Sequence, residues 1–446
     1  MIDLESKYGV PTVAVHVNVF QRIVDGVARS NGMPNARQAF VPAPMFNQPP
    51  AVLRGYVEGD DPIHGGPFMR GVFHMLTRPV DSEDLRGVGW DRTTPRFLEP
   101  DTEENLHRLF LESGWTDYLP IVLPTEERVE AMLAGTSRPP DDYVGKHRPT
   151  VGVEVWESTV EKVAVNAVMA GAAPEHFPVI LALAASGDTG RQSSMSSMGN
   201  IVVVNGPIRN EIGMNCGIGA MGPYNHANAA IGRAFGILSQ NLQGGSVPGA
   251  SYGGSQGSNL SYNCCTFAEN EERSPFVPFH VTRGHQPEES TVTVFYAWGS
   301  VWSEHMRTFW PEKLVAMMSG LEPLEGALFV LDPIVAREFC AQGLDSQQKI
   351  ADWVYENVRV PARRYWDHIM LNMVREQVEQ GVEPWATLAK AEPDELIPLF
   401  MKQGVNVLVT GGETNGHFSI FQAGQMPPPF RSDPTLPLVS PVDPWR

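Results

Sequence analysis

Apolar residues recur at helical spacing along much of the chain. The clearest stripe lies in residues 157–170, where Val160, Val163 and Ala167 share one helix face and Gly171 follows as a stop. The same criterion predicts helices at residues 3–9, 21–31, 102–113, 125–133, 178–185, 227–242, 311–318, 346–358 and 363–380.

Short runs of β-branched and other apolar residues lie between these helices and predict strands. They fall at residues 12–17, 38–41, 200–204, 291–297, 327–331 and 405–410, the last of which is the final strand expected. Because strands alternate with helices, the fold class is α/β. We expect a small, incomplete parallel-sheet domain followed by a larger α/β layered domain with long Gly/Pro-rich loops. No internal repeat is apparent.

The chain length and the distribution of glycine and proline suggest where domains begin and end. A chain of 446 residues is long for one domain, and its 42 Gly and 38 Pro residues require long loops. Four segments are expected: a partial α/β domain with an extended connection (1–98), a helical linker region (99–150), the large α/β domain (151–426) and a Pro-rich tail (427–446). The tail is expected to wrap a neighbour without secondary structure of its own.

Charge and composition exclude several classes of protein. The net charge of -18 would repel a phosphate backbone, so nucleic acid is not an expected partner. No run of 18 apolar residues is present and the first residues lack the features of a secretory signal, so a cytoplasmic protein without a membrane span is expected. The four cysteines read as free thiols without a CxxC pair, which makes a structural zinc site improbable.

The densest candidate for chemistry is the stretch of residues 205–232, which runs from a buried strand into a long helix. Open α/β sheets bind ligands at such places. Its glycines would let backbone N–H groups approach a ligand, and Cys216 is a possible nucleophile. The alternative is a glycine-rich packing loop without a ligand. The candidate substrate-binding residues are Asn205, Arg209, Asn215, His226, Asn228 and Arg233.

Two further stretches carry candidate catalytic groups. Residues 244–272 combine adjacent cysteines with Glu269, a carboxylate that could serve as acid or base for thiolate chemistry, although the cysteines could equally be small buried residues. Residues 408–417 enter a Gly-Gly turn that ends at a histidine, and the alternative there is a surface turn. The candidate catalytic residues are Cys216, Cys264, Cys265, Glu269 and His417. Metal binding stays open because the histidines are scattered, and no cofactor is assigned.

Several sequence motifs resemble known bacterial proteins. The motifs TVEKVAVNAVMAG, PEHFPVILA, IVVVNGPIRNEIGMNCG, GPYNHANAAIGRA and FAENEE resemble a group associated with the UGSC-motif family of (seleno)proteins. The N-terminal stretch from DLESKYGVPTVAVHVNVF to NGMPNARQAFVPAPM is similar to the second half of a UGSC domain. The two resemblances together cover most of the chain.

The resemblance implies a partner. In that family a U/C-G-S-C motif lies in the first βα unit, and this chain begins after that point, so the family's Cys/Sec pair has no counterpart here. The resemblance implies that a small UGSC-like subunit supplies the pair and completes the sheet. The motif is also similar to the selenocysteine motif of proline and glycine reductase subunits, which cleave C–N bonds reductively.

Three functional hypotheses follow. The first is the large subunit of a bacterial enzyme, a lyase or oxidoreductase in preference to a hydrolase, that breaks or forms a carbon–heteroatom bond of a small molecule by thiolate-assisted chemistry. In it, Asn215, His226 and Arg233 orient the substrate, and Glu269 and His417 move protons. The second is a metal-dependent hydrolase, hydratase or lyase. The third is a non-catalytic structural subunit of such a complex.

Overall fold

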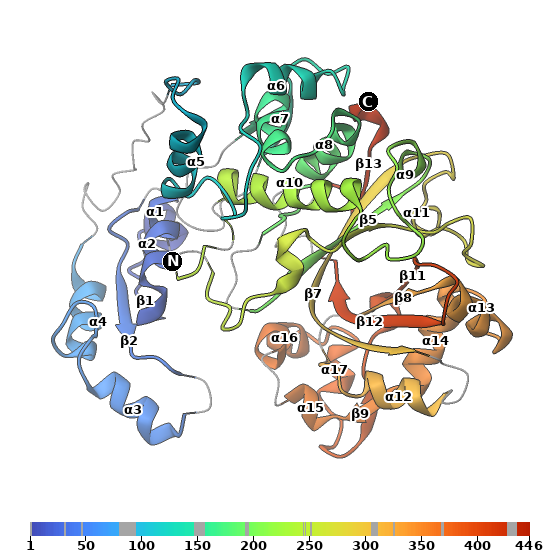
Figure 1. Ribbon diagram of the computed structural model, residues 1–446. Coiled ribbons are helices and arrows are strands. Elements are labelled where there is room, and N and C mark those ends of the chain that lie inside the picture. Colours follow the sequence, from blue (N-terminus) through green and yellow to red (C-terminus); the bar gives the residue numbers. More distant parts are fainter. Residues whose placement is uncertain are drawn as a thin grey trace.

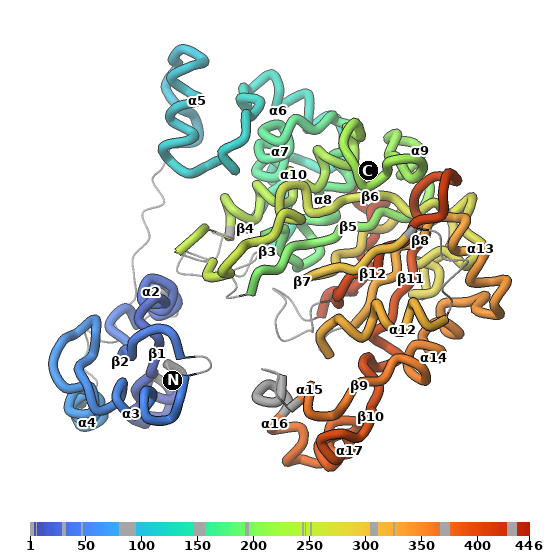
Figure 2. The backbone as a smooth tube through the Cα atoms, turned by 60° about the horizontal axis from the view of Figure 1, so that its bottom comes forward, coloured from blue at the N-terminus to red at the C-terminus, as the bar shows by residue number. Residues whose placement is uncertain are grey.

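A computed structural model describes most of the chain. The described residues are 2–30, 33–45, 48–79, 95–146, 157–191, 196–243, 245, 247–249, 252–304, 311–323, 326–366, 370–425 and 435–446. Figures 1 and 2 show an N-terminal module, residues 2–79, that stands apart from the remainder of the protein. None of the helices in these ranges combines the length and the apolar character that crossing a bilayer requires.

The N-terminal module is built on two parallel strands, in which Ala14 lies opposite Gln38 and Val17 opposite Val41. The small parallel sheet predicted from the sequence is therefore confirmed. The elements are α1 (Ile2–Tyr8), β1 (Ala14–Val17), η1 (Asn18–Phe20), α2 (Gln21–Ser30), β2 (Gln38–Val41), α3 (Pro50–Glu58) and α4 (Phe68–Thr77).

Helices α3 and α4 lie where the sequence predicted only an extended connection, so that prediction was wrong. Pro50 occupies the first position of α3, where its missing N–H costs nothing. Phe68 opens α4 and is buried against Ala39 and Val41 of β2. The prolines and glycines thus mark the ends of short helices rather than a long loop.

Residues 95–146 pack against the large domain. Helices α5 (Glu103–Glu112) and α6 (Glu126–Leu133) are capped by Thr102 and Thr125, whose side chains accept backbone N–H groups. Strand β3 (Tyr143–Lys146) pairs antiparallel with β4 (Glu157–Thr159). The first three residues of the helix predicted at 157–170 therefore form a strand, and α7 (Val160–Met169) begins after its cap, Thr159.

A mixed seven-stranded sheet is the centre of the larger domain (Figure 1). Its strands have the order β11-β8-β12-β7-β5-β6, and β13 pairs with β7. The pairs β5–β6 and β8–β11 are parallel, and the other pairs are antiparallel. The strands are β5 (Gly199–Asn205), β6 (Thr266–Ala268), β7 (Thr291–Glu304), β8 (Ala327–Leu331), β11 (Val405–Val409), β12 (His417–Gly424) and β13 (Val439–Pro441).

Helices cover one face of this sheet in two groups, which confirms the α/β layered domain. The group α7, α8 (Phe177–Ala185) and α10 (His226–Gln243) shares a core with β5 and β7. A second group shares a core with β8, β11 and β12. It comprises α12 (Glu312–Met318), α13 (Pro333–Ala341), α14 (Gln347–Asn357), α15 (Arg363–Trp366) and α17 (Trp385–Leu388). The remaining helices and strands are α9 (Ile208–Glu211), α11 (Phe279–Thr282), α16 (Met370–Glu379), β9 (Arg359–Pro361) and β10 (Leu396–Pro398).

The opposite face of the sheet forms a third core made largely of strand residues. Alternate residues of β5 divide between the two faces: Val202 packs with the helices and Ile201 with the third core. The sheet curls around this core until its two edge strands meet. The N–H of Asn270, after β6, donates to the carbonyl of Val409 in β11 at 2.7 Å.

The sheet consists of two units with the same topology. In one, β5 and β6 are parallel and β7 lies antiparallel beside β5; in the other, β8 and β11 are parallel and β12 lies antiparallel beside β8. The N–H of Glu269 bonds to the Val204 carbonyl as that of Thr410 bonds to the Leu331 carbonyl. A structural repeat is therefore present where no sequence repeat was apparent.

The C-terminal part differs from the prediction. Residues 405–409 form strand β11 as predicted, but this strand is not the last one, because β12 and β13 follow. The tail was expected to lack secondary structure, yet β13 pairs with β7 at Val439 and Thr293, and Val442 is fully buried. These valines occur between prolines, which hid the strand. Of the helix predicted at 363–380, the described residues form α15 and α16, and residues 367–369 lie outside them.

Candidate functional site

Polar side chains converge at the carboxyl ends of β5 and β6. The chain turns from β5 into α9 at Gly206, which has φ +82°, and a Cβ there would lie 2.1 Å from the Glu289 carbonyl oxygen. Only glycine fits this turn. The side chains brought together, here called the β5–β6 cluster, are those of Asn205, Arg209, Glu269, Glu271, Glu272 and His280.

Glu269 is the most deeply placed carboxyl of this cluster, with 1% of the residue exposed. It accepts hydrogen bonds from the Phe279 N–H at 2.9 Å and from the side-chain amide of Asn205. Burial raises the pKa of Glu269 to about 7, because the charged form loses its hydration. A carboxyl with this pKa can gain or lose a proton near neutral pH, as an acid–base group must.

Arg209 ties the cluster together. Its guanidinium donates to both oxygens of Glu272, at 2.9 and 2.7 Å, and to Glu271 at 3.1 Å. Burial alone would lower the pKa of Arg209, but these two carboxylates raise it above its usual value. The hydrogen bonds from Arg209 lower the pKa of Glu272 to about 2. Arg209 and Glu272 therefore remain charged, and Glu272 is the member that reaches solvent.

Two members of the cluster, Glu271 and His280, were not predicted from the sequence as site residues. Glu271 accepts the N–H of Gly206 at 2.8 Å and the amide of Asn205 at 3.0 Å. Buried His280 has its Nδ1 3.9 Å from the Glu271 carboxylate, and burial lowers its pKa. His280 reaches the cluster on the four-residue helix α11, which carries no recognisable pattern in the sequence. Glu271 lies two residues after Glu269 in a stretch with three carboxylates, and nothing in the sequence shows which of them are buried.

Cys216 lies between the cluster and the end of β11. Its carbonyl accepts the N–H of Gly411 at 2.9 Å, and its thiol is half-buried beside Arg209. Burial, with a contribution from Glu272, raises the pKa of the thiol, whereas the charge of Arg209 acts in the opposite direction. The net effect is a raised pKa, so the thiol is protonated at neutral pH in this arrangement.

Cys264 and Cys265 have surroundings that suit packing. Cys264 is fully buried and its thiol donates to the Gly190 carbonyl at 3.3 Å. Part of Cys265 reaches the surface, yet burial raises the pKa of both thiols to about 12. Both residues have positive φ, 49° and 35°, so they form a tight turn before β6. These features favour the alternative in which the pair is structural.

The amides of the 215–228 loop bond to one another and to the loop itself. Asn228 accepts the N–H of Asn215 at 3.0 Å and donates to the Ala220 carbonyl, also at 3.0 Å. The side chain of Asn215 donates to that of Asn225 at 2.8 Å. These bonds hold the loop that carries Cys216, so the asparagines position the thiol rather than point into an open site.

Three other candidates have partners away from the cluster. His226 bonds through Nε2 to the Gly171 carbonyl at 2.8 Å. Arg233 makes two 3.0 Å hydrogen bonds to Asp117, which joins α10 to the segment after α5. The His417 ring lies 5.9 Å from that of Trp302. The structure therefore brings together Asn205, Arg209, Glu269 and Cys216 of the predicted set, and leaves these three elsewhere.

The charge arrangement of the cluster does not form a metal centre. Within the ranges that the structure describes, no group of three or more His, Cys, Asp or Glu side chains is placed to hold a metal ion. In the cluster itself, Arg209 supplies the positive charge that faces Glu271 and Glu272.

No protein-family model matches the chain, and a search of curated proteins found no match.

Proposed function

We propose that the chain is the large subunit of a cytoplasmic enzyme that breaks or forms a carbon–heteroatom bond of a small polar metabolite, with Cys216 as its nucleophile. The observation that carries the proposal is the position of the half-buried Cys216 thiol beside the buried guanidinium of Arg209. Burial keeps the pKa of this thiol raised, but the charge of Arg209 stabilises the thiolate, the form that attacks carbon, once the thiol gives up its proton. Cys264 also has a cation nearby, Arg191, but burial raises the pKa of both Cys264 and Cys265 to about 12, so these thiols are less suited to attack.

A chain of hydrogen bonds connects this thiol site to an acid–base group. Glu269 accepts from Asn205, which also donates to Glu271, and Glu271 accepts from Arg209. In the proposed reaction, the sulfur of Cys216 forms a carbon–sulfur bond, the heteroatom leaves with the bonding electrons, and the proton of the thiol passes to the leaving heteroatom. Protonated Glu269 balances the charge that develops at the leaving atom. It acts through the hydrogen bonds that connect it to Asn205, Glu271 and Arg209.

The proposal includes a small UGSC-like partner subunit that pairs with β1. Within the described residues β1 pairs with β2 alone, and a two-stranded sheet is marginally stable by itself. Val15 of β1 is 52% exposed, and Val10 and Val19 on either side of the strand are 46% and 58% exposed. Apolar residues at an open strand edge suit pairing with another chain.

Genetic complementation tests the role of Cys216 without knowledge of the substrate. Host cells that lack the gene receive the wild-type chain, Cys216→Ala or Cys340→Ala, and their metabolites are compared. Cys340 is the matched control, a half-buried free thiol on α13, far along the chain from the cluster. We expect C216A cells to show the metabolite change of the deletion strain, and C340A cells to resemble wild type. Full rescue by C216A would contradict the role of Cys216 as nucleophile and would favour a structural role for the chain.

The partner is tested separately by purifying the tagged chain from its host. We expect a second, smaller chain in a fixed ratio, carrying a UGSC-like βα unit. An active monomer that contains this chain alone would contradict the two-subunit part of the proposal and leave the role of Cys216 standing.

A further inference from the structure

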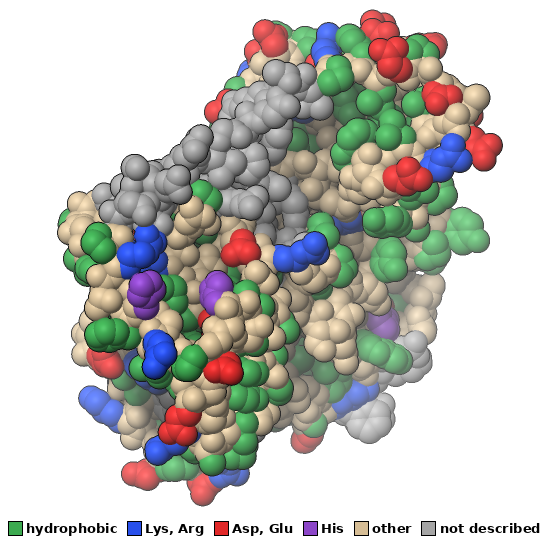
Figure 3. Space-filling model, turned by 90° about the vertical axis from the view of Figure 1, so that its left-hand side faces the viewer, with side chains coloured by type: hydrophobic (Ala, Val, Ile, Leu, Met, Phe, Trp, Pro, Cys, Tyr) green, Lys and Arg blue, Asp and Glu red, His purple; other side chains and the backbone are tan. Residues whose placement is uncertain are grey.

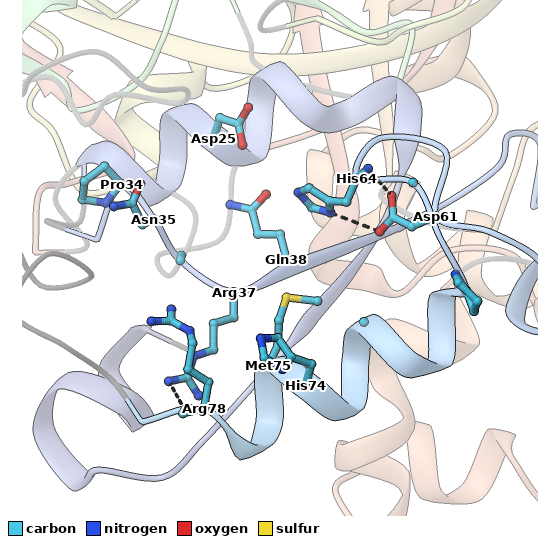
Figure 4. A pocket seen from close by; sticks show the side chains of 14 residues that line it. Asp25, Pro34, Asn35, Arg37, Gln38, Asp61, His64, His74, Met75 and Arg78 are labelled. Atoms are coloured by element: carbon cyan, nitrogen blue, oxygen red, sulfur yellow. Dashed lines mark hydrogen bonds and ion pairs between the residues drawn. The ribbon is translucent and has the colours of Figure 1, made fainter.

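The N-terminal module contains a pocket that shares no residue with the β5–β6 cluster (Figure 4). It has a volume of about 460 Å³ and is lined by α2, β2, α4 and the loops between them. Small-molecule sites commonly have volumes of this size. The polar lining has basic side chains at one end and hydrogen-bond acceptors along one side.

Arg37 at the start of β2 is the deepest basic group of the pocket. Its side chain is 2% exposed, and within the described residues its Nε and Nη1 have no hydrogen-bond acceptor. Nη2 donates to the Arg78 carbonyl at 2.5 Å, and the Glu5 carboxylate lies 3.6 Å from Nη1, beyond hydrogen-bonding distance. Buried donors without acceptors cost free energy. An acceptor that entered the pocket would recover that cost.

Other basic side chains line the same pocket. Arg78 follows α4, and His74 lies in the last turn of that helix. Figure 4 shows Arg37 and Arg78 near each other at one end of the pocket, while the His64 ring is held by Asp61 at 3.2 Å at the other. On the face that the N-terminal module presents in Figure 3, His and Arg or Lys side chains gather close together.

The pocket also offers hydrogen-bond acceptors. Gln38 Oε1 is buried and has no donor in the part of the chain that the structure describes, and Asp25 projects from α2, across the pocket from α4 in Figure 4. Asp61 is already occupied, because it accepts the N–H groups of Phe40 and Ile63. The open acceptors thus belong to Gln38 and Asp25.

We propose that this pocket binds a small organic anion that also carries a hydroxyl or ammonium group, such as a hydroxy acid. Its carboxylate or phosphate accepts from Arg37 and Arg78, a geometry that guanidinium groups favour. Its hydroxyl or ammonium group donates to Gln38 or Asp25. The site is independent of Cys216 and of the reaction proposed above.

Isothermal titration calorimetry of the full chain tests this site with three probes: lactate, propionate and inorganic phosphate. Lactate and propionate carry the same charge, and only lactate has the hydroxyl. We expect saturable binding of lactate or phosphate, with lactate about fivefold tighter than propionate, the gain that one net hydrogen bond of about 1 kcal/mol provides.

Arg78→Gln is the test variant, because truncation of Arg37 would leave buried Glu5 without its cation. We expect R78Q to weaken anion binding by about tenfold or more. Arg70→Gln is the matched control, an exposed arginine on the same helix α4 and outside the pocket lining. R70Q should bind as wild type.

Two outcomes would overturn the proposal: no saturable binding of any probe, or equal affinities of R78Q and wild type. Propionate binding as tight as that of lactate would refute the role given to Gln38 and Asp25. Circular dichroism of R78Q, compared with that of R70Q, shows whether a loss of binding comes from unfolding instead.

Discussion

The two topologically equivalent units of the central sheet carry different polar side chains at equivalent strand ends. In the first unit, Asn205 ends β5 and Glu269 follows β6; in the second, Asp332 follows β8 and Thr410 follows β11. Glu269 and Thr410 make the same backbone hydrogen bond to the neighbouring strand. The hydrogen-bond partners of the side chains, however, differ between the two units.

In the second unit the polar side chains satisfy backbone groups. Asp332 caps α13 by accepting the Val335 N–H at 2.8 Å, and it also accepts the N–H of His417. Thr410 donates through Oγ1 to the Ala268 carbonyl at 2.9 Å. In the first unit, Asn205 bonds to the carboxylates of a charged cluster, and Glu269 accepts from Asn205 as well as from the Phe279 N–H. One unit thus serves as a scaffold, and the other holds the groups with perturbed pKa values, which are typical of functional sites.

We expect the largest difference in lost stability between the two units when one arginine is replaced in each. Arg209→Met removes the cation that Glu271 and Glu272 share, and breaking a buried ion pair costs about 3–5 kcal/mol. Since Glu272 is partly exposed, we expect the lower end of that range. Urea denaturation measures the change.

Arg337→Met is the matched control in the second unit, because Arg337 pairs with Glu413 at the surface. Exposed ion pairs contribute about 0–1 kcal/mol. Equal losses for the two variants would contradict the view that the charged cluster is specific to the first unit.

A pH effect is expected next in size, and it belongs to Glu269. Its pKa of about 7 in the folded protein exceeds the ordinary value of 4.5, so the folded state holds the proton more tightly than the unfolded state. The stabilisation is fully present below pH 4.5 and is lost as the pH rises to about 7. The loss over this window is on the order of 2–3 kcal/mol.

Glu269→Gln tests this assignment, because glutamine cannot ionise. Thermal unfolding followed from pH 5 to 7.5 should be flatter for E269Q than for wild type. The position of Thr410 carries no titratable group, so Thr410→Val should keep the wild-type slope. Parallel pH profiles of wild type and E269Q would show that Glu269 is not the group that titrates.

The sequence predicted the parts of the fold that depend on local patterns. Residues 38–41 and 327–331 were predicted as strands with the bounds that β2 and β8 have, because each is a short, mostly apolar run that includes Phe and Val. Two of the cluster residues, Asn205 and Arg209, also followed from their places after a predicted strand, and Glu269 was chosen because it lies close in sequence to two cysteines. His280 was not predicted, since its position depends on how a four-residue helix packs far along the chain.

Long-range pairing explains most of what the sequence missed. Strand β6 has three residues and exists because it pairs with β5. Strand β12 mixes buried and half-buried residues and lies between β7 and β8. The structural repeat depends on these same pairings, so it left no motif to recognise. The choice of Cys216 over Cys264 and Cys265 likewise required their burial, which spacing does not reveal.

Asp332→Ala should show the structural role of the second unit. The substitution removes the cap of α13 and the acceptor for the His417 N–H. Loss of an N-cap costs about 0.5–2 kcal/mol, and we expect the upper part of that range. Urea denaturation should show this loss while the anion affinity of the N-terminal pocket stays unchanged. Asp332→Asn, which can still cap the helix, should recover most of the stability.

The smallest effect is expected for Thr410, the counterpart of Glu269. Thr410→Val keeps the shape of the side chain and removes the hydrogen bond from Oγ1 to the Ala268 carbonyl, which should cost about 1 kcal/mol. Because this bond joins β11 to β6, hydrogen exchange should speed up at the backbone amides of residues 268–270 and 409–411. Thr414→Val, whose hydroxyl contacts only Asn415 among the described side chains, is the control and should leave exchange unchanged. If exchange in T410V is unaltered where β6 and β11 meet, the scaffold unit holds the cluster through its backbone bonds alone, with Asn270 to Val409 as the principal contact.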